Sequence, residues 1–89
     1  MEVIKIQIIN KLGLHARAAS KFSSTCTKFA SKISVTKDSK TVDGKSIMSL
    51  MLLAAPIGTM LDISCNGPDE KEALKAIVDL INNRFEEAE

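Results

Sequence analysis

Residues 3–29 read VIKIQIINKLGLHARAASKFSSTCTKF, and the period of their apolar residues changes partway through. Residues 3–9 predict a strand with one buried face, because Ile4, Ile6 and Ile8 alternate with the polar residues Lys5 and Gln7. After a loop over residues 10–13, apolar side chains recur at helical spacing, which predicts a helix over residues 16–29. A half-buried strand followed by an amphipathic helix indicates a fold that mixes both kinds of element.

A hairpin and a second helix are predicted next. Residues 33–36 and 40–42 alternate in polarity on either side of the turn-prone pair Asp38-Ser39, which is typical of a β-hairpin. Ser46 is a preferred N-cap residue and precedes a helix predicted over residues 47–54. The apolar residues that share one face of this helix are Ile47, Leu50, Met51 and Ala54.

The last third of the chain predicts one more strand and one more helix. Residues 61–66 alternate in polarity, and Gly67-Pro68 separates this strand from a helix that begins at Asp69. Asp69 and Glu72 have the spacing of a capping box. The tail over residues 86–89 is expected to be a frayed, solvated end. The apolar stripe of the last helix comprises Leu74, Ile77, Leu80, Ile81 and Phe85.

The predicted order is therefore strand, helix, strand, strand, helix, strand, helix. Each strand has one polar face, and such strands belong to an antiparallel or mixed sheet that is covered on one side only. We therefore predict an α+β open-faced sandwich, with a four-stranded antiparallel sheet and three helices on one face. A chain of 89 residues is long enough for one modest core, so residues 1–89 are expected to form a single domain.

Composition excludes several classes of function. Twelve basic and eleven acidic residues give a net charge of +1, which is too small to favour nucleic acid as a partner. Neither a signal-peptide pattern nor an apolar run of membrane length is present, so we expect a cytoplasmic protein with no membrane insertion. Cys26 and Cys65 are expected to be buried thiols. One histidine and two dispersed cysteines make a poor structural metal site, so neither a metal nor a cofactor is predicted.

The single histidine lies in the stretch Gly13-Leu14-His15-Ala16-Arg17, where strand-like sequence gives way to helical sequence. A neutral imidazole is nucleophilic near neutral pH, and the first amides of a helix bind anions. His15 is therefore a candidate to carry a phosphoryl group, with the guanidinium of Arg17 on the phosphoryl oxygens. Gly13, two residues before His15, is expected to leave room for a partner protein to approach the histidine. The predicted amide donors of this anion cradle are Ala16, Arg17 and Ala18.

That stretch and a second one, Gly44-Lys45-Ser46-Ile47-Met48, resemble the HPr family of histidine-containing phosphocarriers of the bacterial phosphotransferase system. The resemblance extends over nearly the whole chain. It implies that His15 accepts a phosphoryl group on Nδ1 from phosphorylated enzyme I and donates it to an enzyme IIA domain. The chain is then a carrier without catalysis of its own, and it is expected to act as a monomer.

The resemblance also assigns roles to the second helix. Ser46 matches a position that a dedicated serine kinase phosphorylates in some relatives. Ile47, Met48 and Met51 are expected to form the contact surface for partner proteins, because flexible thioethers adapt to differently shaped partners. Met48 is predicted to be exposed, whereas Ile47 and Met51 are expected to lie between the core and the rim.

The chain departs from the family pattern at one point. Ala18 occupies the position where the family usually has proline, and Ser20 replaces the usual threonine. Two other functions stay open: a regulatory module that docks on a partner when Ser46 is phosphorylated, and a small ligand-binding domain without phosphoryl chemistry. Within the phosphocarriers, the stretch around Ser46 favours the sugar-type branch over the nitrogen-regulatory one.

Overall fold

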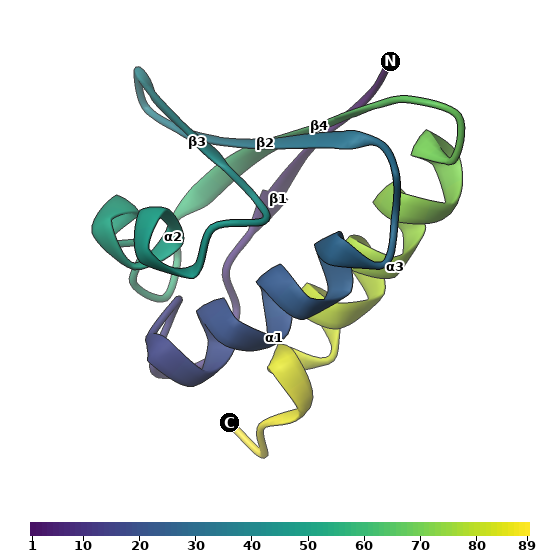
Figure 1. Ribbon diagram of the computed structural model, residues 1–89. Coiled ribbons are helices and arrows are strands. Elements are labelled where there is room, and N and C mark those ends of the chain that lie inside the picture. Colours follow the sequence, from purple (N-terminus) through teal and green to yellow (C-terminus); the bar gives the residue numbers. More distant parts are fainter.

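The computed structural model describes residues 1–89, and its amphipathic strands pair into one antiparallel sheet. Three helices cover one face of this sheet and the other face is open (Figure 1). The predicted open-faced α+β sandwich and the predicted order of elements are therefore confirmed. The elements are β1 (Glu2–Gln7), α1 (Ala16–Thr27), β2 (Lys32–Lys37), β3 (Lys40–Asp43), α2 (Ile47–Leu53), β4 (Met60–Asn66), α3 (Glu70–Asn82) and a 3₁₀ turn, η1 (Arg84–Glu86).

The strand order is β1-β4-β2-β3, so β4 runs between β1 and β2. On the covered face, Ile63 of β4 lies opposite both Ile4 and Val35. On the open face, Lys5 lies opposite Asp62, with 3.4 Å between Lys5 Nζ and Asp62 Oδ1. A register slip of one residue would turn the isoleucines to solvent, so the alternation that predicts each strand also fixes the pairing.

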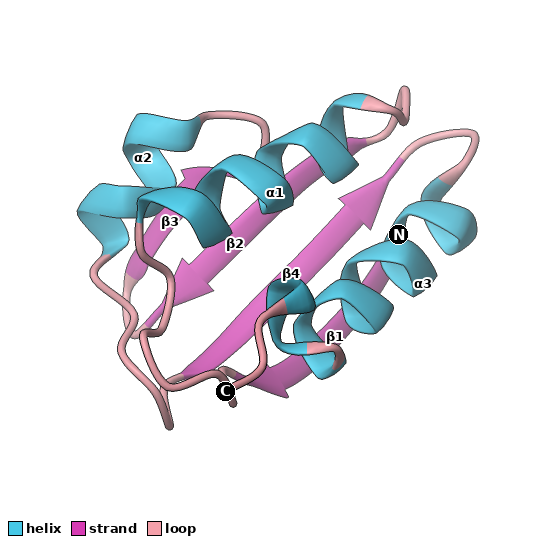
Figure 2. Cartoon of the chain, turned by 90° about the horizontal axis from the view of Figure 1, so that it is seen from below, coloured by secondary structure: helices cyan, strands magenta, loops and turns pink.

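The core lies between the sheet and the helices. α1 runs across the middle of the sheet, with α2 on the β3 side and α3 on the β1 side (Figure 2). Phe22 of α1 and Ile77 of α3 are fully buried there. Burial of a side chain of this size contributes about 1.5–3 kcal/mol to folding. The two thiols, Cys26 and Cys65, are also fully buried and unbonded, as predicted.

The short helix α2 packs through a narrower face than the sequence suggests. Leu50 and Leu53 are buried, whereas Ile47 is 42% exposed and Met51 is 45% exposed. Ile47 and Met51, predicted to divide between core and rim, therefore both lie at the rim, and neither belongs to the buried core. A helix of seven residues at the edge of the sheet contacts the core through one stripe, and its other apolar residues face solvent.

The ends of the elements differ from the sequence predictions by a few residues. α1 ends at Thr27 because Lys28 and Phe29 donate to the carbonyls three residues back, which tightens the last turn. α3 ends at Asn82, so Phe85 reaches the core from η1 and not from the helix. α3 has 13 residues, and no helix is long and apolar enough to cross a bilayer.

The predicted capping box at Asp69 and Glu72 is absent. Asp69 makes no side-chain cap bond to α3. Its carboxylate instead accepts hydrogen bonds from the amides of Ala30 and Ser31, both at 2.9 Å, and from the Ser31 hydroxyl. Asp69 therefore fixes the loop between α1 and β2. Its two amide partners lie 39 and 38 positions earlier in the sequence, so local spacing does not reveal these contacts.

Candidate functional site

The loop that leads into α1 is held from both sides. The Asn10 side-chain amide donates to the Gly13 carbonyl at 2.8 Å, and the Leu14 amide donates to the Ala55 carbonyl at 2.9 Å. Asn10 and Leu14 are buried. His15 follows as the N-cap residue of α1, with an extended backbone and its carbonyl bonded to the Ala19 amide. The loop thus places the imidazole at the positive end of α1.

Gly13 has a different role from the predicted one. It is buried, its φ is +68°, and an added Cβ would lie 2.5 Å from the Ala55 carbonyl oxygen and 2.8 Å from Pro56 Cα. The glycine therefore allows two segments of this chain to touch, rather than leaving room for a partner. Because Leu14 and His15 follow directly, this contact fixes the position of the histidine.

The first amides of α1 have no backbone acceptors, as expected at a helix N-terminus. The His15 side chain does not cap them. Ala16 and Arg17 are exposed, but Ala18 is fully buried. The amides of Ala16, Arg17 and Ala18, predicted to form the anion cradle, are thus all without a backbone acceptor. α1 begins at Ala16 although alanine stands at position 18, so proline is not needed to start this helix.

The His15 ring contacts the tail of the chain. Nε2 of His15 lies 2.5 Å from Glu87 Oε2, and the Asn10 side-chain amide donates to Glu87 Oε1 at 3.1 Å. The side chains of His15 and Glu87 are 27% and 14% exposed, while His15 Nδ1 makes no hydrogen bond. Partial burial disfavours ionisation of Glu87, but the hydrogen bonds from Asn10 and His15 and the nearby Arg17 outweigh it and lower the pKa of this carboxyl.

The expectation of a frayed tail is therefore wrong. Phe85 is fully buried, and the Lys21 ammonium donates to its carbonyl at 2.8 Å. Three consecutive left-handed residues, Arg84 to Glu86, turn the chain back toward the start of α1. The polar residues 86–89 give no sign of this turn. The apolar Phe85 just before them is the one signal in the sequence that this part of the chain packs against the core.

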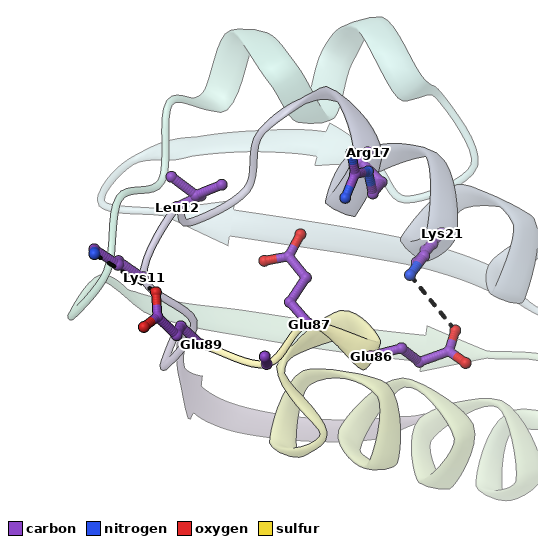
Figure 3. Close-up of a pocket in the computed structure, with 8 residues that line it drawn as sticks. Lys11, Leu12, Arg17, Lys21, Glu86, Glu87 and Glu89 are labelled. Atoms are coloured by element: carbon purple, nitrogen blue, oxygen red, sulfur yellow. Dashed lines mark ion pairs between the residues drawn. The ribbon is translucent and has the colours of Figure 1, made fainter.

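Arg17 and Glu87 border a hollow of about 530 Å³ between α1, the loop before it and the tail, here called the tail hollow (Figure 3). Arg17 is exposed and its side chain takes part in no hydrogen bond or ion pair, so its guanidinium is available to an anion. Four other charged side chains that line the hollow form two ion pairs with one another. Lys11 pairs with Glu89 at 3.5 Å, and Lys21 pairs with Glu86 at 3.8 Å.

Ser46 is the N-cap of α2, as predicted. Its hydroxyl oxygen accepts the Ser49 amide at 3.2 Å, and its O–H donates to the Ser49 hydroxyl at 3.0 Å. Ser46 is partly exposed, so its hydroxyl has both a structural role and access to solvent.

Exposed apolar side chains extend along α2. Met48 is 72% exposed and Leu52 is 67% exposed. We call Ile47, Met48, Met51 and Leu52 the α2 patch. The segment 54–56, which follows α2, borders a shallow depression together with Leu12 and His15. The segment that follows the α2 patch therefore lies beside the histidine, and the patch includes Leu52, which the sequence analysis missed.

The family described as "PTS HPr component phosphorylation site" matches residues 3–83. The chain belongs to the HPr family. It is 55% identical over 84 residues to the phosphocarrier protein HPr of Neisseria meningitidis, which covers 94% of each chain. It is 51% identical over 90 residues to the phosphocarrier protein HPr of Pseudomonas aeruginosa, which covers all of each chain. Among solved structures, that of HPr-C-His from Thermoanaerobacter tengcongensis has a TM-score of 0.96 at 48% identity, with 100% of both chains covered.

Membership in the HPr family assigns this chain to the phosphocarriers of the phosphotransferase system and agrees with the resemblance seen in its two motifs. The family description refers to a phosphorylation site, and His15 is the single histidine of the chain. The HPr fold here brings His15 beside residues 54–56, which follow α2, and Arg17 beside Glu87, although these segments are widely separated in sequence.

Proposed function

We propose that this chain is a phosphoryl carrier in which His15 Nδ1 accepts a phosphoryl group from phosphorylated enzyme I and donates it to enzyme IIA domains. The observation that carries the proposal is the position of His15. Its ring is partly exposed at the start of α1, its Nε2 is occupied and its Nδ1 is free. Residues 1–89 act as one cytoplasmic carrier domain, as a monomer and without a cofactor or metal.

The surroundings of His15 suit an anion that must be held and then released. The unpaired amides of Ala16, Arg17 and Ala18 and the Arg17 guanidinium are the donors for a phosphoryl group on Nδ1. Phosphoryl transfer requires alignment and charge stabilisation more than covalent help from the protein. A carrier with a few donors and one cation stabilises the phosphorylated state without preventing the next transfer.

The test is phosphorylation by labelled phosphoenolpyruvate and enzyme I, followed by discharge to several enzyme IIA domains. The wild-type chain should gain one acid-labile, alkali-stable phosphate, and His15→Ala should gain none. Label on His15→Ala would refute the assignment. The acceptor that discharges the wild-type chain identifies its pathway and separates the sugar branch from the nitrogen-regulatory branch.

Arg17→Ala should slow transfer by about 10- to 100-fold, the loss expected when one charge-assisted hydrogen bond is removed. Arg84→Ala is the matched control, because Arg84 is the only other arginine and is not among the residues that line the tail hollow. If both variants slow transfer equally, Arg17 has no special role. Circular dichroism of each variant verifies that the fold is retained.

We further propose that a serine kinase phosphorylates Ser46 and thereby changes which partners bind the α2 patch. A phosphate adds about −1.5 to −2 charges at the N-cap of α2, where negative charge is compatible with the helix. The fold is expected to survive, while an acidic surface on enzyme I is repelled and a basic partner surface is attracted.

Ser46→Asp and Ser46→Asn separate the charge at this position from the loss of the hydroxyl. The aspartate should bind enzyme I more weakly than the asparagine does, and it should gain affinity for any regulatory partner with a basic surface. Equal binding of both variants to every partner would refute regulation by charge at Ser46.

A further inference from the structure

The carboxylate of Glu87 is held in place on both oxygens. Oε2 contacts His15 Nε2 at 2.5 Å and Oε1 accepts from Asn10 Nδ2 at 3.1 Å. Asn10 is fully buried and its amide also donates to the Gly13 carbonyl, so the same side chain fixes the loop before His15 and the carboxylate behind it. Burial of Phe85, two residues earlier, anchors the tail. Glu87 is thus a held side chain and not a mobile surface carboxylate.

A carboxylate with this contact determines where the imidazole carries its proton. An ionised carboxylate only accepts hydrogen bonds, so the nitrogen that faces it must carry hydrogen. In a neutral imidazole the other nitrogen then has the free lone pair. Here the nitrogen that faces the carboxylate is Nε2, so the lone pair is on Nδ1.

The other charged groups near this pair favour the ionised carboxylate on balance. Arg17 approaches it from α1, and Lys11 and Lys21 line the same hollow from the loop and from α1. Glu86 and Glu89 lie on the tail itself and pair with these two lysines. The hydrogen bonds from Asn10 and His15 favour the charged form of Glu87 despite its partial burial, which lowers its pKa.

We propose that Glu87 is a positioning residue for phosphoryl transfer: it keeps the proton on His15 Nε2 and so leaves Nδ1 as the nucleophile. The proposal rests on the proposed function of the chain. In the accepting step, the Nδ1 lone pair forms the N–P bond, while the N–P bond of the donor phosphohistidine breaks and its electron pair stays on the donor ring. His15 becomes an Nδ1-phosphorylated imidazolium whose Nε2 proton stays in place, and the Glu87 carboxylate balances the new positive charge.

The same contact assists the donating step. The electron pair of the N–P bond returns to Nδ1, and the ring departs as a neutral imidazole because Nε2 is still protonated. Loss of the Nε2 proton would make the leaving group an imidazolate, which is a far stronger base. An aspartate that holds a catalytic histidine in one tautomer has the same effect in serine proteases. At metal sites, a histidine that binds the metal through one nitrogen also commonly donates from the other to a carboxylate or carbonyl that orients the ring.

The experiment measures the tautomer of His15 by ¹⁵N NMR of the unphosphorylated full chain, and then its charging and discharge. The wild-type chain should show the Nε2–H form. Glu87→Ala should lose this preference and give a mixture of both tautomers. Glu87→Gln retains a carbonyl acceptor but no charge, so it should keep the tautomer and discharge to an enzyme IIA domain about tenfold more slowly.

Glu86→Gln is the matched control, because it removes the same charge from the adjacent residue, whose contact is with Lys21. Its tautomer and rates should equal those of the wild type. The proposal is overturned if Glu87→Ala keeps the wild-type tautomer, or if Glu87→Gln discharges as fast as Glu86→Gln. A wild-type chain that is never charged by enzyme I would refute the proposed function, whereas the tautomer measurement would still decide the role of Glu87.

Discussion

Gly13→Ala tests how the loop before His15 is positioned. The added methyl group would lie 2.5 Å from the Ala55 carbonyl oxygen and 2.8 Å from Pro56 Cα, and both of these are backbone atoms that cannot rotate away. A left-handed conformation costs a residue other than glycine about 1–3 kcal/mol, and forcing a methyl group into a packed site costs about 1–3 kcal/mol more. We therefore expect a loss of about 2–6 kcal/mol in the free energy of unfolding.

Gly58→Ala provides the matched control. Gly58 also has a positive φ, +90°, but a Cβ there would meet no atom within 4 Å. Urea unfolding followed by circular dichroism measures both variants, and the difference between them isolates the contact with residues 55 and 56. Transfer from enzyme I should also slow in Gly13→Ala under conditions where the variant is folded. Equal losses of stability in the two variants would show that the close approach at Gly13 carries no energy.

Three further predictions concern Ser46, Met48 and Glu87. Ser46→Ala removes the acceptor for the Ser49 amide and should cost about 1 kcal/mol in urea unfolding; an unchanged midpoint would show that the cap is not stabilising. Met48→Ala removes a side chain that is 72% exposed, so stability should change by less than about 0.5 kcal/mol while calorimetry detects weaker binding of enzyme I. Unchanged affinity would exclude Met48 from the contact surface. Burial opposes ionisation of Glu87, yet the bonds from Asn10 and His15 leave its pKa below the ordinary 4.5. The unfolded chain therefore binds more protons below that pH, so the stabilisation is complete above about pH 4.5 and is lost as the pH falls. Glu87→Gln has no carboxylate to protonate at this position, so its free energy of unfolding should fall less than that of the wild type as the pH is lowered. An identical decrease in the two proteins would contradict this.

The elements that rest on local physical chemistry could be predicted from the sequence. Alternating polarity marks each strand, because its two faces meet different environments. Ser46 satisfies an amide three residues ahead, so its cap is visible in a few letters. His15 and Arg17 could be singled out because a histidine and an arginine at a helix start suit an anion. These features need no knowledge of the rest of the chain.

The features that could not be predicted depend on contacts between distant residues. Asp69 and Glu72 have the spacing of a capping box, but the Asp69 carboxylate instead accepts hydrogen bonds from two amides of the loop after α1. In the sequence Gly13 looks like any loop glycine, because its contact with the Ala55 backbone appears only in the folded chain. Glu87 lies 72 residues from His15, and polar residues near it carry no periodic signal that would connect the two.

The burial of the two thiols gives the chain a practical property. Burial raises the pKa of Cys26 to about 12 and also raises that of Cys65. Since the thiolate is the reactive form, neither native cysteine should react with a maleimide while the chain is folded. A cysteine introduced on the open face of the sheet, such as Val3→Cys at a position that is 60% exposed, would then be the single site for a fluorophore. Because the helices are on the other side of the sheet, and His15 is the N-cap of α1, such a label would report docking of partners without occupying their surface.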